Sequence, residues 1–118
     1  MRCAAVILVV ASLVPAVSQA QDCAGTTADM AACGSAEFQL ADAELNAVYG
    51  RAMAAAERGG FAADLRAAQR LWIPYRDAAC QVEAAPYAGG SIAPLIFVGC
   101  LTRLTEERTQ ALRLIYEN

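Results

Sequence analysis

Cysteine is the residue type in this chain with the greatest capacity for chemistry, because several of the usual catalytic groups are missing. The 118 residues include five cysteines but neither histidine nor lysine, so the common general base and the common Schiff-base nucleophile are absent. Ser91 has no histidine to activate it as a nucleophile. Glu106 and Glu107 are adjacent on an expected helix, where their side chains diverge by about 100° and cannot flank one glycosidic bond. We therefore expect a protein that is not an enzyme and needs no cofactor.

The cysteines indicate a disulfide framework. If Cys3 is removed with an export signal, Cys23, Cys33, Cys80 and Cys100 remain, and an even number in a short exported chain is typical of disulfides. A zinc site is the alternative, but no close Cys-x-x-Cys pair and no histidine is present, so no metal is expected. Three pairings are possible. Cys23–Cys33 with Cys80–Cys100 is preferred because each closes a short loop, contributing about 3 kcal/mol by loop entropy.

The amino-terminal segment has the features of a secretory signal peptide. Arg2 precedes an apolar run at residues 4–17, and small residues lead up to Ala20, where signal peptidase would cut. The run is shorter than the roughly 20 residues that span a bilayer, which argues against an uncleaved anchor. We expect a signal peptide at residues 1–20, followed by one periplasmic or secreted domain at residues 21–118.

The charge of that domain restricts its partners. Without the signal peptide, the chain has twelve acidic and eight basic residues and a net charge of −4. Nucleic acid and anionic membranes are poor partners for such a surface. A cationic protein is favoured electrostatically.

Residues 21–118 show helical periodicity and no alternating strand pattern. The first helix is expected over residues 35–58, and Gly59 and Gly60 are expected to end it. A turn capped by Thr26 or Thr27 is expected before it. Gly34 is expected to break or bend the chain between that turn and the helix.

Two more helices are expected, separated by a loop at residues 84–94. On the second helix, which begins near Phe61, the expected buried residues are Leu65, Ala68, Trp72, Tyr75 and Ala79. Pro74 predicts a kink there, or two helical pieces. On the third helix they are Leu101, Leu104, Ala111, Leu112 and Ile115. The sequence therefore predicts an all-α, disulfide-stapled three-helix bundle with up-down-up topology.

A set of motifs occurs in a fixed order across nearly the whole domain. In chain order they are Cys23, Met30 and Cys33; ADAELNAVY at residues 41–49; AQRLWIPYRDAAC at 68–80; GGSIAP at 89–94; and Cys100 with LTRLTEER at 101–108. This set resembles the small exported bacterial family typified by the LprI-type lysozyme inhibitor N-terminal domain, from which Pro74 departs.

The resemblance implies an all-helical periplasmic or cell-surface domain with two disulfides and a protein partner, lysozyme. The function it implies is binding and blocking a lysozyme-type muramidase. An envelope interaction or stress-accessory module with no lysozyme target is the alternative.

Charged residues at the expected helix seam predict an internal ion pair. Arg108 lies between apolar residues, and a buried guanidinium needs a carboxylate partner, which Asp42 or Asp77 could supply. Arg76 is a second candidate for the same pairing. We expect these contacts to fix helix register, the alternative being a binding hot spot. Two polar residues are candidates for a buried contact between the first two helices: Asn46 and Gln69.

The loop at residues 84–94 is the candidate binding loop. A Cys80–Cys100 bridge would staple its base, and a preorganised loop loses less entropy on binding. Its candidate contact residues are Tyr87, Gly89, Gly90 and Ser91. The alternative is a helix connection whose glycines serve only its turns.

Overall fold

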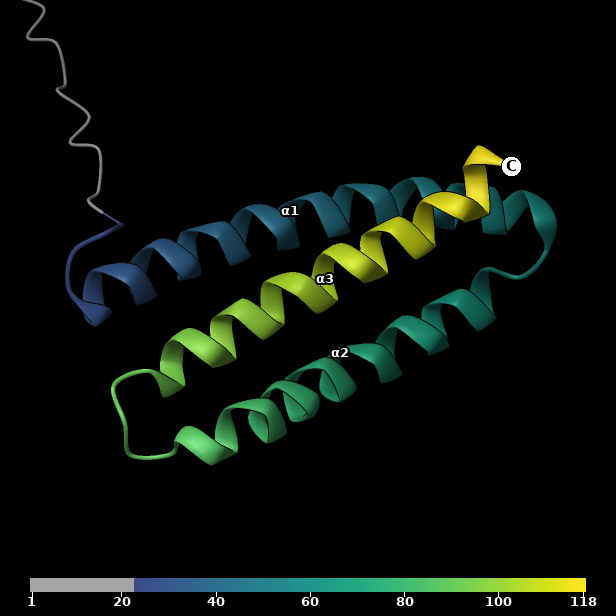
Figure 1. Cartoon of the computed structure of the whole chain (residues 1–118). Helices are drawn as coiled ribbons and strands as arrows, with labels where there is room; N and C mark the ends of the chain where they lie inside the picture. The colour runs from purple at the N-terminus through teal and green to yellow at the C-terminus, as the bar shows by residue number, and fades with distance from the viewer. Residues whose placement is uncertain (1–22) are drawn as a thin grey trace, which may run out of the picture.

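A computed structural model describes residues 23–118. The expected signal peptide lies outside these residues. The described part consists of α1 (Thr27–Gly59), α2 (Ala62–Ala84), a 3₁₀ turn η1 (Ala85–Tyr87) and α3 (Ala93–Glu117). No strand occurs between residues 23 and 118, so the all-α prediction is confirmed. In Figure 1, α1 and α3 run in the same direction, α2 runs against them, and α3 lies between the other two.

The start and end of α1 follow from capping chemistry. Thr26 Oγ1 accepts from the Asp29 backbone N–H at 3.2 Å, while the Thr26 N–H donates to Asp29 Oδ2 at 2.8 Å. This reciprocal capping box satisfies two N–H groups that a helix start leaves free. At the other end, Gly60 takes a left-handed φ of 81°, which glycine adopts without strain.

No break interrupts α1 at Gly34, so the alternative of a broken helix there is wrong. A Cβ atom built on Gly34 would lie 2.8 Å from Val98 Cγ1. The missing side chain therefore lets α1 and α3 approach closely at this point, and the residue has a packing role.

α2 continues through Pro74 as one helix, so the alternative of two helical pieces is wrong. The predicted buried face of α2 was also partly wrong. Gln69 and Arg76 are buried, whereas Ala68 and Tyr75 are exposed. Gln69, expected in a buried contact, and Arg76, expected in an internal ion pair, occupy part of that face, because the stem and planar head of an arginine can cover apolar surface.

The core consists of two clusters along the bundle. One contains Leu45, Val48, Ala52, Ala56, Leu65 and Leu112, drawn from all three helices. The other contains Cys80, Cys100 and Leu101, with Phe38, Phe97 and Leu104 packed against it. Ala111 is exposed, contrary to prediction, while Thr105 and Thr109 are buried. The Thr109 hydroxyl donates to the Thr105 carbonyl at 2.8 Å, which makes this polar group compatible with burial.

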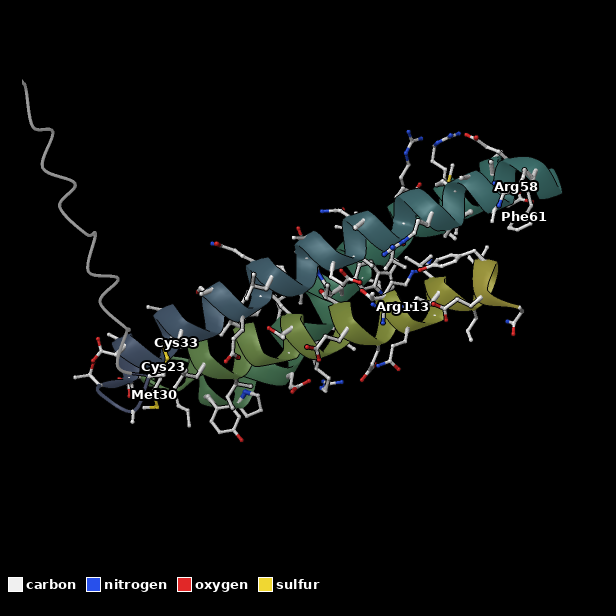
Figure 2. The ribbon with its side chains drawn as sticks, turned by 90° about the horizontal axis from the view of Figure 1, so that it is seen from above. Cys23, Met30, Cys33, Arg58, Phe61 and Arg113 are labelled. Atoms are coloured by element: carbon white, nitrogen blue, oxygen red, sulfur yellow. A yellow bond between two sulfur atoms is a disulfide. The ribbon has the colours of Figure 1, made fainter. Side chains whose placement is uncertain are left out.

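Both predicted disulfides are present. Cys23–Cys33 ties the chain before α1 to its second turn, next to Met30 (Figure 2). Cys80–Cys100 joins the end of α2 to the start of α3. The sulfur atoms of Cys23, Cys33, Cys80 and Cys100 are thereby bonded to one another and are not free to bind zinc.

None of the helices between residues 23 and 118 combines the length and the apolar composition that a membrane-spanning segment requires.

Candidate functional site: a groove between α1 and α3

A groove follows the seam between α1 and α3. Its larger part has a volume of about 610 Å³ and is lined by Glu37, Leu40, Ala41, Glu44, Thr102, Glu106, Thr109, Gln110 and Arg113. A hollow of about 390 Å³ continues it toward the Cys23–Cys33 disulfide. Glu37, Thr102 and Glu106 line both parts, so the two form one surface. Figure 2 labels residues at its two ends, Arg113 and the Cys23–Cys33 pair.

Two carboxylates in this groove lack partners. Glu37 from α1 and Glu106 from α3 are both exposed. Within residues 23–118, neither side chain has an ion pair or a hydrogen bond. Glu44, farther along the groove, differs because it pairs with Arg113 and Arg51. The hydrogen bond that Arg113 donates to Glu44 raises the pKa of Arg113. The free negative charge of the groove is therefore concentrated where its two parts join.

An exposed apolar side chain accompanies these acids. Leu40 lines the larger part of the groove and is 73 % exposed. The same larger part of the groove is lined by three short side chains, Ala41, Thr102 and Thr109. Exposed apolar surface rimmed by polar groups is typical of a protein-binding site. Chemically, the groove can accept hydrogen bonds from a cationic side chain and cover apolar surface beside it.

The bundle interior contains a separate, fully partnered cation, Arg76. Its guanidinium lies 2.9 Å from Asp77 Oδ1 and 3.7 Å from Asp42 Oδ1, and it donates to the Thr105 hydroxyl at 3.3 Å. It also lies 5.2 Å from the ring centroid of Phe38. The residue connects α2 to both other helices. This arrangement fits a role in fixing helix register.

Arg108 makes different contacts from those expected. Its Nε donates to Gln69 Oε1 at 2.9 Å, and its guanidinium lies 5.9 Å from the Trp72 ring centroid. Within the described chain it has no ion pair with Asp42 or Asp77, so the predicted pairing is wrong for this arginine. A half-buried guanidinium that keeps some water needs only one neutral acceptor and an aromatic face. Burial lowers the pKa of Arg108.

Gln69 is buried as expected, but its partner is Arg108. Asn46 is exposed and donates to Asp42 on its own helix at 3.4 Å. The predicted contact between Asn46 and Gln69 across two helices is therefore wrong.

The candidate binding loop forms an ordered turn at one end of the bundle. η1 ends at Tyr87, the Gly90 N–H donates to the Tyr87 carbonyl at 3.0 Å, and Gly89 takes a φ of 82°. Tyr87 and Ser91 are exposed. An apolar hollow of about 550 Å³ lies at its base, lined by Gln81, Ala84, Ala85, Ala88, Ala93, Pro94 and Phe97. The loop is thus available to a partner, although it offers no charged side chain.

Sequence reasoning did not identify Glu37 and Glu106 as a pair. They are 69 positions apart, and the helical pattern says only that both face outward. The missing information is the register of α1 against α3, which the Gly34–Val98 contact sets. A glycine inside a helical pattern was the only signal of that register.

Comparisons with known proteins agree with this architecture. The family described as "Lysozyme inhibitor LprI" matches residues 18–112. A Rhizobium meliloti (strain 1021) protein named "Uncharacterized protein R02472" is 35% identical over 102 residues, covering 76% of this chain and 73% of its own. The crystal structure of a DUF1311 family protein (pp0307) from Pseudomonas putida KT2440 has a TM-score of 0.64 at 28% identity, covering 75% of this chain and 92% of that chain. The ordered motifs, the two disulfides and these matches together show that the chain belongs to the LprI lysozyme inhibitor family.

Proposed function

We propose that this protein is an exported inhibitor that binds and blocks a cationic lysozyme-type muramidase through the α1–α3 groove. The observation that carries the proposal is a pair of groove carboxylates, Glu37 and Glu106, with which no residue from 23 to 118 pairs, in a chain that belongs to a lysozyme inhibitor family. The family assignment supports a binding role, and inhibitors of this kind act without catalysis.

The physical basis is charge complementarity. A lysine or arginine of the muramidase that enters the groove would form charge-assisted hydrogen bonds with Glu37 and Glu106, which are stronger than neutral ones. Leu40 would cover apolar surface beside that side chain. The overall acidity of the chain would steer a cationic enzyme toward it and raise the association rate.

The two disulfides support an extracytoplasmic location, because such bonds persist in oxidising compartments. The expected signal peptide supports the same location. We therefore place the protein in the periplasm or outside the cell.

The loop at residues 84–94 is a second proposed contact surface. Its aromatic residue Tyr87 is exposed, and the Cys80–Cys100 disulfide holds its base. The groove is preferred because it offers charge to a cationic partner, whereas the loop offers none.

The test is the clearing of a peptidoglycan suspension by c-type, g-type and i-type lysozymes, with and without the oxidised domain. Stoichiometric inhibition of one class is the expected result. No inhibition of any class, by protein shown to be helical and free of thiols, would contradict the proposal and favour the envelope interaction module.

A further inference from the structure

The outer side of α2 carries an apolar stripe that no other helix of the described chain covers. Its members are Ala67, Leu71, Pro74, Tyr75, Ala78 and Val82, all exposed. Leu71, Tyr75 and Val82 are 73 %, 64 % and 74 % exposed. Among the apolar side chains of residues 23–118 these are three of the largest exposures, and they lie on one face of one helix. Contiguous exposed apolar surface of this kind marks an interaction site.

The spacing of the α2 stripe is that of a helix-pairing seam. Apart from the adjacent pair Pro74 and Tyr75 at its centre, its members recur at intervals of three and four residues, the pattern with which two helices pack along each other. They are also symmetric about the midpoint between Pro74 and Tyr75. In an antiparallel pair of identical helices centred there, Leu71 meets Ala78 of the second copy and Ala67 meets its Val82. Leu71 and Val82 therefore each face an alanine, which allows close approach, while Tyr75 faces Pro74 of the second copy.

Charges beside the stripe favour the same arrangement. Arg70 and Asp77 lie seven residues apart on one flank of α2, so a two-fold antiparallel pair brings each Arg70 near Asp77 of the other copy. Within residues 23–118, Arg70 has no ion pair or hydrogen bond. Asp77 bonds Arg76 through Oδ1 only and its side chain is 51% exposed, which leaves Oδ2 free to accept. A parallel pair would not bring these opposite charges together.

We propose that the protein forms a two-fold antiparallel homodimer through the α2 stripe. A two-fold interface requires a surface that complements itself, and both the apolar pattern and the flanking charges do so. The stripe spans about 22 Å at roughly 1.5 Å per residue, so the interface is small and the dimer is weak and reversible. No residue of α2 lines the α1–α3 groove, so the dimer leaves two grooves free. The inference does not depend on the proposed inhibitory function.

The test is sedimentation equilibrium of the oxidised chain without its expected signal peptide, over a range of concentrations. The average mass is expected to rise from one chain toward two. Leu71→Glu and Val82→Glu should each hold the protein at the mass of one chain. Leu114→Glu, on an exposed apolar residue of α3, is the matched control and should behave as the parent. A parent chain that stays monomeric up to about 1 mM, or dimerisation that survives Leu71→Glu, would overturn the proposal.

A charge exchange tests the antiparallel register. Arg70→Glu and Asp77→Arg should each weaken the dimer when alone, and an equimolar mixture of the two should restore it, because both cross-chain pairs are then opposite in charge. If Asp77→Arg disturbs Arg76 and unfolds the chain, Arg70→Glu and Arg70→Ala, which leave Asp77 in place, give a second test: the reversed charge should weaken the dimer more than the neutral side chain does. Failure of the folded combination to restore dimerisation would contradict the antiparallel arrangement.

Discussion

Arg76 and Glu37 illustrate two different uses of charge in this small bundle. Arg76 is buried and bonded to Asp77, Asp42 and Thr105, so its charge is compensated inside the protein. Glu37 is exposed, and no residue of the described chain pairs with it. The first arrangement contributes to the fold, and the second leaves charge available to a partner.

Loss of Arg76 should destabilise the fold without affecting binding chemistry directly. Arg76→Ala removes its bonds to two carboxylates and its packing against Phe38 and Trp72, and we expect a loss of about 2–4 kcal/mol in the free energy of unfolding. Arg66→Ala, on an exposed arginine of the same helix, should cost less than about 0.5 kcal/mol. Urea unfolding measures both. Equal losses for the two variants would contradict the assigned role.

Asp29 should make the start of α1 sensitive to acid. Hydrogen bonds from Thr26 hold the pKa of Asp29 below its ordinary 3.8. The capping contribution is therefore complete above pH 3.8 and is lost as the pH falls through the lower pKa of the folded state. Titration of the Thr26 amide signal by NMR should show this change, and Asp29→Asn should abolish it. An Asp29 that titrates at or above 3.8 would contradict the capping box.

For individual residues, the sequence predicted which charged side chains lie near the seam between the helices, but not which residues they bond. Arg76, Asp42 and Asp77 do meet, whereas Arg108 bonds Gln69 instead. The spacing of apolar residues indicates which face of its own helix a residue lies on. It does not say which neighbouring helix supplies the acceptor.

Among the elements, α1 shows how a single glycine sets the distance between helices. Gly34 contacts Val98 so closely that a Cβ would lie 2.8 Å from a methyl group, while Gly50 has open space around it. The two glycines lie in the same helix, and only one has a packing role.

Alanine should therefore have opposite effects at the two glycines. Gly34→Ala forces α1 and α3 apart and should cost about 1–3 kcal/mol, as overpacking does. Gly50→Ala gains helix propensity and should stabilise by about 0.5–1 kcal/mol. Thermal unfolding monitored by circular dichroism compares them. Stabilisation by both substitutions would show that the helices do not meet closely at Gly34.

The turn between α2 and α3 is the element that tests the second proposed contact surface. Because the groove is the preferred site, Tyr87→Ala with Ser91→Ala should change lysozyme inhibition by less than about threefold, within 0.7 kcal/mol or so. Inhibition titrations on the folded double variant measure this. A loss of tenfold or more would move the contact to the loop.

Element boundaries were predictable where local chemistry decides them. Gly60 ends α1 through a left-handed backbone, close to the predicted end of the helix. Thr26 was predicted to cap only a separate turn, whereas it caps α1 itself, which begins at Thr27 and not at residue 35. The continuation of α2 through Pro74 was not predictable in the same way. Packing of the buried face of α2 outweighs the local cost of a missing N–H, and the helix continues.

For the whole molecule, the fold class followed from helical periodicity and the disulfides from loop length, because both depend on residues close in sequence. The groove did not follow, because it depends on how α1 and α3 align, and their residues Glu37 and Glu106 are 69 positions apart in the sequence. The net charge of −3 of the full sequence indicates only the sign of a partner. The position of Glu37 opposite Glu106 gives that charge a place on the surface.

The measurement that tests the central claim most directly is inhibition of the responsive lysozyme class by two double variants of equal net charge. Glu37→Gln with Glu106→Gln removes the free carboxylates of the groove, whereas Glu57→Gln with Glu117→Gln removes two exposed carboxylates outside it. The first variant should weaken inhibition by at least about tenfold, the loss expected for charge-assisted hydrogen bonds. The second should change it by less than about threefold, because only long-range steering is reduced. Equal weakening by both variants, or none by the first, would contradict a binding site in the α1–α3 groove.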